Sequence, residues 1–125
     1  MHSDERVETR IREIGSRLPK CVYWRISKLA TYRYVQTDPC NKPAWTNQLK
    51  FYMFRITFNL EIINKYSEGA VTGIIAHEFA HVIDSFPFGL KNRDKEEERV
   101  NTLACAWGFS ENIKQAREED RKILS

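Results

Sequence analysis

The segment from Val71 to Asp84, VTGIIAHEFAHVID, limits the folds open to this chain of 125 residues more than any other. It contains two of the three histidines, and its apolar residues recur at helical spacing. With Ser67 upstream as a predicted N-cap, the pattern predicts a helix with one buried face. Because each residue of a helix turns by about 100°, His77 and His81 would lie one turn apart on one face. Two imidazoles at that separation can both bind one tetrahedral Zn²⁺.

Glu78 directly follows the first of these histidines, which places its carboxylate beside the metal rather than on it. There it can take a proton from a water that the zinc activates, an arrangement typical of H-E-x-x-H metallopeptidases. The alternative is that the spacing arises by chance, and that His77 and His81 only satisfy hydrogen bonds near the core of an ordinary helix.

Composition and charge indicate which broad classes of protein this chain does not fit. The hydrophobic fraction of 42% and the charged fraction of 30% are ordinary for a globular protein, and the length predicts a single domain over residues 1–125. The net charge of +3 is spread along the chain, which argues against a dedicated nucleic-acid surface. No apolar run approaches the ~20 residues of a membrane span, and the polar N-terminus lacks the apolar segment of a secretory signal.

The three cysteines, Cys21, Cys40 and Cys105, are odd in number and show no C-x-x-C spacing. We therefore expect reduced thiols in a cytoplasmic protein, with a disulfide between two of them as the alternative.

Sequence patterns before the H-E-x-x-H segment indicate a helix followed by a small sheet. We predict an amphipathic helix from about Asp4 to Leu18, capped by Ser3 and ended by Pro19. The remaining predicted elements are one bent or two short strands over 21–36, a loop over 38–47 and a strand over 49–60. Such a sheet, mixed or antiparallel with three to four strands, can present an edge strand to an extended peptide. The sequence does not indicate which strand lies at the edge.

Two further helices are expected after the H-E-x-x-H helix. A loop follows Asp84, and a helix then runs from about Asp94 to Trp107, with Gly108 as its C-terminal stop. A highly charged helix follows over 110–125, with Ser110 as its predicted N-cap. The fold class predicted from this order is α+β, with the helices that carry the site after the sheet.

A catalytic zinc site needs a third protein ligand, and His2 at a frayed terminus is a poor candidate. The acidic run Glu96-Glu97-Glu98 lies on the next predicted helix. Helical phase points Glu98 away from the buried stripe and leaves Glu96 and Glu97 at its flanks. One turn after Glu97, Asn101 could accept the free N–H of a zinc-bound histidine. We therefore predict Glu97 as the ligand, with Glu96 as the alternative.

Structural roles compete with these assignments. Glu97 could instead form a capping box with Asp94, or belong to a solvated acidic run. Asp84 is predicted to pair with an arginine, Arg93 or Arg99. A peptidase also needs a donor for the oxyanion, for which Tyr66 and the same two arginines are the candidates.

These residues together resemble the gluzincins, metallopeptidases with H-E-x-x-H on one helix and a glutamate ligand on a following helix. The similarity spans Val71 to about Phe109, and Glu97-x-x-x-Asn101 is most similar to compact ImmA/IrrE-like bacterial and phage peptidases. HEFAHVID also resembles the metal helix of lethal-factor-like peptidases. The resemblance implies a minimal zincin-like fold, bound Zn²⁺ and a peptide or protein substrate. The residues it implies for the site are His77, His81 and Glu97 as ligands and Glu78 as general base.

The predicted function is hydrolysis of peptide bonds by a zinc-dependent enzyme. Two other classes remain open. The chain could be a catalytically weak or inactive zinc-binding interaction module that binds a partner through its sheet or its last helix. It could also be a helical adaptor in which the H-E-x-x-H spacing is accidental.

Overall fold

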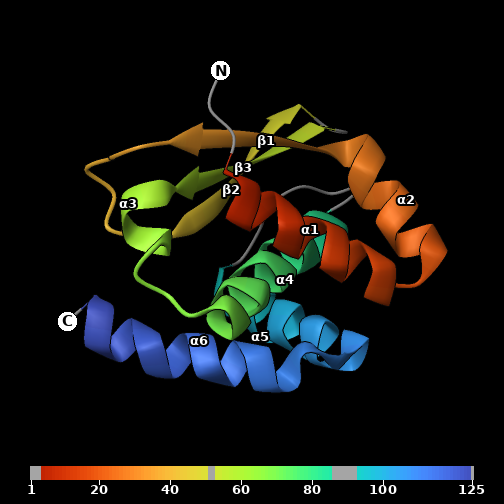
Figure 1. Ribbon diagram of the computed structural model, residues 1–125. Coiled ribbons are helices and arrows are strands. Elements are labelled where there is room, and N and C mark those ends of the chain that lie inside the picture. The colour runs from red at the N-terminus through yellow and green to blue at the C-terminus, as the bar shows by residue number, and fades with distance from the viewer. Residues whose placement is uncertain (1–3, 51–52, 86–92, 125) are drawn as a thin grey trace.

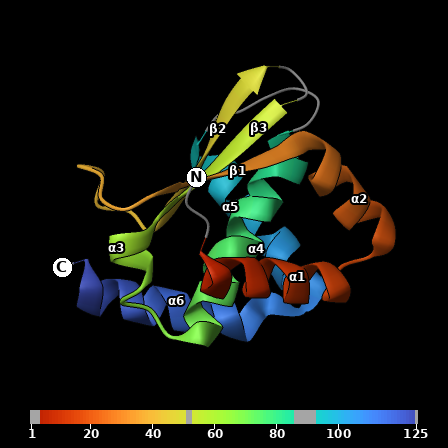
Figure 2. The same ribbon diagram turned by 45° about the horizontal axis from the view of Figure 1, so that its top comes forward.

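A computed structural model describes residues 4–50, 53–85 and 93–124 of the protein (Figure 1). A three-stranded mixed sheet lies over the long helix α4 (Glu68–Ser85), and α6 (Ser110–Ile123) runs along α4 on the side away from the sheet (Figure 1, Figure 2). The fold is α+β, as predicted. Within the described ranges, no helix is long and apolar enough to cross a lipid bilayer.

The N-terminal helix α1 (Glu5–Arg17) forms where its amphipathic pattern predicts it. Asp4 is the N-cap, because its side chain accepts a hydrogen bond of 3.0 Å from the backbone N–H of Val7. The predicted cap, Ser3, lies outside the described residues. The apolar face of α1 is buried against α4, with the following residues at its centre: Val7, Ile11 and Ile14.

The prediction of strand structure from residue 21 was wrong for its first half. After Pro19 the chain forms a second helix, α2 (Lys20–Leu29), and only then a strand. The aromatic and β-branched composition favours a strand, but Val22, Ile26 and Leu29 recur at helical spacing and pack on the core. Ile26 is fully buried, so tertiary packing decides the conformation of this segment.

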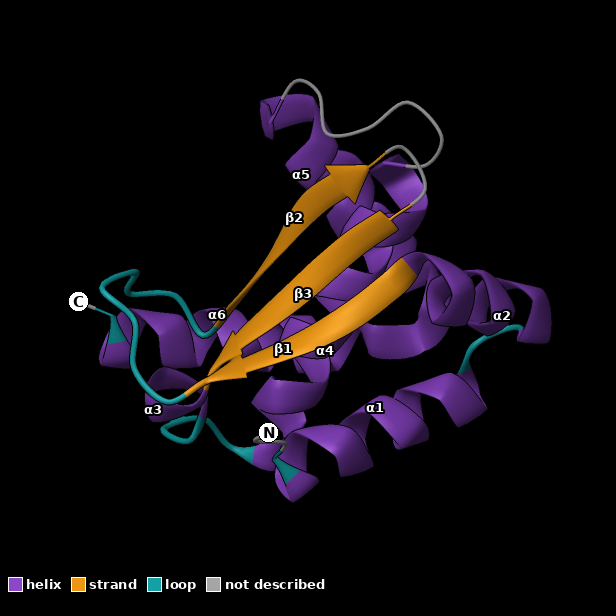
Figure 3. Cartoon of the chain, turned by 90° about the horizontal axis from the view of Figure 1, so that it is seen from above, coloured by secondary structure: helices purple, strands orange, loops and turns teal. Residues whose placement is uncertain are grey.

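The sheet has the strand order β1-β3-β2, which puts β1 (Ala30–Val35) and β2 (Ala44–Lys50) at its edges. β3 (Met53–Asn59) pairs in parallel with β1 and antiparallel with β2 (Figure 3). The predicted loop over 38–47 was therefore wrong at its C-terminal end, and the predicted strand over 49–60 is divided between β2 and β3. The alternation that predicted this strand begins at Leu49, near the end of β2, and continues into β3, so it did not reveal the division.

One face of β3 contributes the largest buried side chains of the sheet, and Ala30 of β1 and Ala44 of β2 join it in the core. Phe54, Ile56 and Phe58 on that face are fully buried, as their alternation predicts. A short helix, α3 (Leu60–Ile63), then leads to Ser67, whose hydroxyl accepts a hydrogen bond of 3.3 Å from the backbone N–H of Ala70. The predicted N-cap of the H-E-x-x-H helix is thus confirmed.

Helix α4 is buried along most of its length and contacts α1, α2, α5, α6 and β2. Gly73 allows α6 to approach closely, because a Cβ added there would lie 2.3 Å from the backbone oxygen of Asn112. The two helices are antiparallel. Asn112 donates a hydrogen bond to Gly69, whereas Gln115, further along α6, donates to Ser67, which precedes Gly69 in the chain.

After α4, the chain forms α5 (Arg93–Ala104) and a π-helical turn, η1 (Cys105–Phe109). The turn ends α5 three residues before the predicted end at Trp107. Gly108 has a φ of 97°, the left-handed conformation expected of a helix stop. The prediction of Ser110 as N-cap was wrong, because Phe109 takes that position and Ser110 is the first residue of α6.

Candidate metal centre

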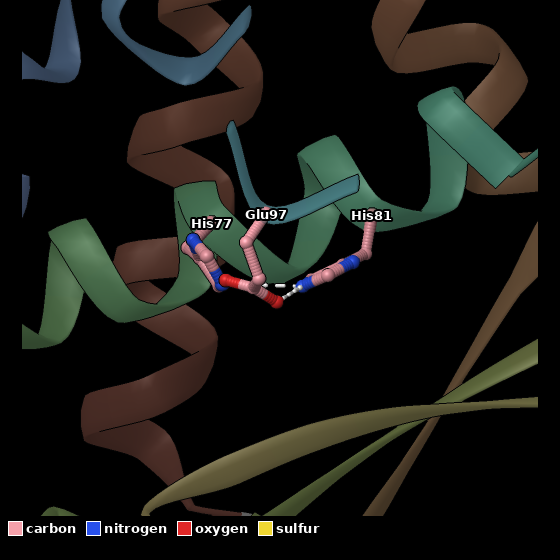
Figure 4. A group of neighbouring side chains, drawn as sticks. All are labelled: His77, His81 and Glu97. Carbon is pink, nitrogen blue, oxygen red and sulfur yellow. Dashed lines mark hydrogen bonds and ion pairs between the residues drawn. The ribbon is translucent and has the colours of Figure 1, made fainter. Parts of the chain in front are cut away.

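Helix α4 presents His77 and His81 on one face, and α5 brings Glu97 to them (Figure 4). The two Nε2 atoms lie 3.1 Å apart. The Glu97 carboxylate reaches both imidazoles, with Oε1 3.0 Å from Nε2 of His81 and Oε2 3.3 Å from Nε2 of His77. The structure therefore brings together the three predicted ligand residues, which form a group able to hold a metal ion.

These separations fit a tetrahedral zinc ion. Zinc binds histidine nitrogen and carboxylate oxygen at ~2.0–2.1 Å, which places neighbouring ligand atoms of a tetrahedron ~3.3 Å apart. The distance between the two Nε2 atoms, 3.1 Å, and the distances from each of them to the nearer Glu97 oxygen, 3.0 and 3.3 Å, are close to this edge length, and each histidine contacts a different oxygen of the carboxylate. A fourth position, opposite the protein ligands, is the one that catalytic zinc sites leave open for water or substrate.

The outer nitrogen of each histidine has its own partner. Nδ1 of His77 lies 3.1 Å from Oδ1 of Asn101, the contact predicted from helical spacing. Nδ1 of His81 lies 2.6 Å from Oε2 of Glu96. Both partners are acceptors, so each imidazole donates from Nδ1 and directs the Nε2 lone pair inwards. These contacts orient the two rings for metal binding.

Glu96 and Glu97 thus have different positions, which the sequence alone left as alternatives. Glu97 lies at the Nε2 atoms with a side chain 53% exposed, whereas Glu96 is 4% exposed and holds the far side of His81. Glu98 points to solvent, as its helical phase predicts. The burial of Glu96 was not predicted. Glu96 and Glu97 are adjacent and lie about 100° apart around the helix axis, on the two sides of the apolar stripe. Only the packing of α5 on α4 decides which of these two sides is covered.

The electrostatics also favour a cation at this point. Burial by itself lowers the pKa of His77, but the hydrogen bond that it donates to Glu97, the charges of Glu78 and Glu97 and the Asn101 contact outweigh burial and raise the pKa. The hydrogen bond from His77 lowers the pKa of Glu97 to about 2. When both imidazoles are neutral, two inward nitrogen lone pairs and a carboxylate converge here, and either a proton on Nε2 or a metal cation between the groups relieves their repulsion.

Glu78 lies beside this group, as predicted, and is only 7% exposed. Its Oε1 accepts a hydrogen bond of 2.7 Å from the Thr46 hydroxyl, which comes from β2. Sequence analysis missed Thr46, because the residue falls in the predicted loop and no local pattern links it to a helix thirty residues later. The bond fixes the orientation of the carboxylate and ties the edge strand to α4.

A cavity of about 690 Å³ opens over the histidines between β2, α4, α5 and α6. Its metal end is lined by His77, His81, Glu97 and Glu78. From there the cavity extends along β2 towards the N-terminal half of α4 and the C-terminal half of α6. The sequence did not indicate which strand could receive a peptide at the sheet edge. In the structure, β2 is the edge strand that borders the cavity.

The other predicted residues lie apart from this group. Arg99 donates to both carboxylate oxygens of Asp84 at 2.9 and 3.1 Å, the structural pairing predicted. The Tyr66 hydroxyl, a candidate oxyanion donor, is buried and donates to Asp120 instead. The side chains of Arg93 and Asp94 lie outside the described part of the chain, so the proposed capping box stays untested.

Comparisons with models of protein families, with curated protein sequences and with solved structures found no significant match.

Proposed function

We propose that the chain is a zinc-dependent peptidase in which His77, His81 and Glu97 hold Zn²⁺ and Glu78 is the general base. The observation that carries the proposal is the convergence of two imidazole Nε2 atoms and the Glu97 carboxylate within 3.0–3.3 Å of one another, with the buried Glu78 carboxylate beside them and an open cavity above. Structural zinc sites are usually closed by four protein ligands, whereas the residues that the structure describes offer three here.

When bound, zinc lowers the pKa of a coordinated water and polarises the scissile carbonyl. Glu78 takes a proton from the attacking water as its oxygen adds to the carbonyl carbon. The same carboxyl group then delivers that proton to the leaving nitrogen as the C–N bond breaks. Thr46 holds one oxygen of Glu78, so the other oxygen is free to accept the proton. Asn101 and Glu96 keep the imidazoles in the required tautomer and orientation.

The proposed substrate is an extended peptide that pairs with β2. An edge strand offers unpaired backbone N–H and C=O groups, which give affinity without regard to sequence. β2 lies along the cavity, and Thr46 in that strand contacts the general base. A peptide added to this edge therefore passes over the metal. The unpaired state of the three cysteines fits our placement of the chain in the cytoplasm.

A second candidate is a zinc-binding interaction module with weak or no activity. It is favoured by the oxyanion candidates, because Tyr66 is engaged by Asp120 and Arg99 by Asp84. Within the described residues, neither side chain is free to donate to a substrate oxygen at the metal. Under this alternative, the same ligand set stabilises the fold, and β2 binds a partner peptide that is not cleaved.

The Glu78→Gln variant separates the two candidates. Under the peptidase proposal it keeps zinc but loses cleavage of a diverse peptide library by about 10²–10⁴-fold, the usual contribution of a general base. Glu98→Gln is the matched control, because it is the same Glu-to-Gln substitution at an exposed position near the site. Cleavage by Glu78→Gln at the wild-type rate would refute the role of Glu78. Zinc bound tightly by a wild type that cleaves nothing would favour the module instead. Absence of near-stoichiometric zinc in protein prepared without chelators would exclude both.

A further inference from the structure

The cavity has two chemically different ends. At the metal end its titratable side chains are the histidines and three glutamates, whereas the far end is lined by Lys42, Arg117 and Asp120. Lys42 comes from the segment that leads into β2, and Arg117 comes from α6. Between the two ends lie apolar side chains, among them Ile74 and Ala116. The far end is therefore a basic region on the same cavity that holds the metal group.

The two cations at this end have no partners within the described chain. Lys42 and Arg117 are exposed, and neither side chain forms a hydrogen bond or an ion pair with a described residue. The carboxylate of Asp120, by contrast, accepts the hydrogen bond of the buried Tyr66 hydroxyl. Two cations without described partners, against the single carboxylate of Asp120, favour an anionic group at this end of the cavity.

The distance between the two ends follows from the helix geometry. Because α6 is antiparallel to α4, Arg117 lies beside the N-terminal end of α4, level with residues near Ser67. The ten residues from there to His77 span ~15 Å at 1.5 Å each. An extended peptide covers ~3.3 Å per residue, and a long arginine side chain shortens the gap. The basic end therefore lies roughly two to four residues from the bond at the metal.

The direction of β2 orients the peptide. β2 runs from the side of α6 towards α5 (Figure 3). Thr46 of β2 contacts Glu78, and Lys42, which precedes Thr46 in the chain, also lines the cavity. A peptide that pairs antiparallel with β2, the more stable arrangement, runs from the metal towards Lys42. Its residues after the scissile bond then approach the two cations.

We propose that Lys42 and Arg117 bind a carboxylate of the substrate, two to four residues on the C-terminal side of the cleaved bond. This inference rests on the proposed peptidase function. The carboxylate is either the side chain of an Asp or Glu residue or the C-terminus of the peptide, since both present the same anion. The site thus selects acidic or short C-terminal segments after the cleavage point, in a cleft whose backbone contacts are otherwise indifferent to sequence.

The test uses zinc-loaded full-length protein and four matched peptides. One pair carries Glu or Gln at the third position after the cleaved bond, with an amidated C-terminus. The other pair lacks acidic residues and ends there with a free or an amidated C-terminus. Wild type should show a higher kcat/KM for the member with the carboxylate. The pair that shows the preference identifies the source of the anion.

Charge variants connect any preference to the two cations. Arg117→Ala and Lys42→Ala should each reduce the preference by roughly two- to fivefold, the range of a solvent-exposed ion pair. Arg117→Glu should reverse it in favour of a peptide with Lys at that position. Arg121→Ala is the control, because Arg121 is an exposed arginine one turn further along α6 that does not line the cavity. A preference unchanged in Arg117→Glu overturns the proposal.

A binding measurement separates this inference from the proposed function. The zinc-loaded Glu78→Gln variant should bind the carboxylate peptide more tightly than its matched partner, with the same dependence on Arg117. If wild type cleaves no peptide but this difference in Kd remains, the carboxylate site stands and the peptidase function falls. If wild type cleaves all four peptides equally, the carboxylate site falls and the peptidase function stands.

Discussion

Replacing each glutamate of the run Glu96-Glu97-Glu98 by glutamine tests the geometry of the metal group most directly. The three changes are chemically identical and adjacent on α5, but the structure gives each residue a different position. Glu97 lies at both Nε2 atoms, Glu96 contacts the outer nitrogen of His81, and Glu98 points to solvent. Zinc affinity should therefore fall most for Glu97→Gln, less for Glu96→Gln and not at all for Glu98→Gln.

The magnitudes follow from these positions. Loss of a group that orients a metal ligand costs about 10- to 100-fold in affinity, or about 1.4–2.7 kcal/mol. We expect Glu96→Gln near the lower limit, because the amide oxygen can still accept from Nδ1 of His81 while the charge is lost. Glu97→Gln removes a charged ligand and leaves two histidines, so its loss should exceed 100-fold. Glu98→Gln should change the affinity by less than a factor of two, as expected of an exposed charge.

The assay is competition for zinc between each variant and a chromogenic chelator at fixed pH and ionic strength. Circular dichroism and urea unfolding of the metal-free proteins check that each variant folds. A loss for Glu96→Gln equal to or greater than that for Glu97→Gln would refute the assignment and make Glu96 the ligand. Equal small losses in all three would refute a carboxylate ligand from this run altogether.

Three further predictions concern residues that support the site. Thr46→Val should lower kcat by roughly tenfold through loss of a hydrogen bond to a charged group, with zinc affinity unchanged and activity retained in Thr46→Ser. Gly73→Ala should destabilise the fold by about 1–3 kcal/mol in urea unfolding, because its Cβ meets the α6 backbone, whereas Gly69→Ala meets only the movable side chain of Gln115. Stability should also depend on Glu119, whose hydrogen bonds from Ser67 outweigh burial and lower its pKa. A lowered pKa in the folded state gives stability that is complete above the usual pKa near 4.5 and is lost as pH falls through the folded value. The stability difference between metal-free wild type and Glu119→Gln should therefore shrink as the pH falls below the usual pKa of 4.5, and a difference independent of pH would contradict the assignment.

Local sequence patterns were sufficient to predict an element where one short segment contains all the residues that determine it. Helix α1, the capped helix α4 and the buried face of β3 follow from periodicity and from residues adjacent in the chain. Adjacency also explains why His77, Glu78 and His81 could be predicted as a group, since helical geometry alone brings them together. The position of Asn101 one turn after Glu97 is a local relation of the same kind, and its contact with His77 was found as predicted.

Where a sequence pattern fits two structures equally well, packing decides which of them forms. The segment forming α2 has the composition of a strand and the spacing of a helix, and burial of Ile26 favours the helix. Alternation runs without a break from β2 into β3, so the antiparallel pairing of Gln48 with Phe54 could not be seen in it. Each of these outcomes depends on contacts between segments that are distant in sequence.

The grouping of His77, Glu78 and His81 was thus determined by the sequence alone, because these residues lie within about one helical turn. The tertiary structure decided everything that joins this helix to other segments. It placed Glu97 at the Nε2 atoms of the histidines and Glu96 behind His81, brought Thr46 to Glu78, and made β2 the edge along the cavity. The physical reason is the separation along the sequence over which each effect acts. Backbone geometry fixes neighbours a few residues apart, whereas the relative position of separate elements is set by which apolar faces they bury together.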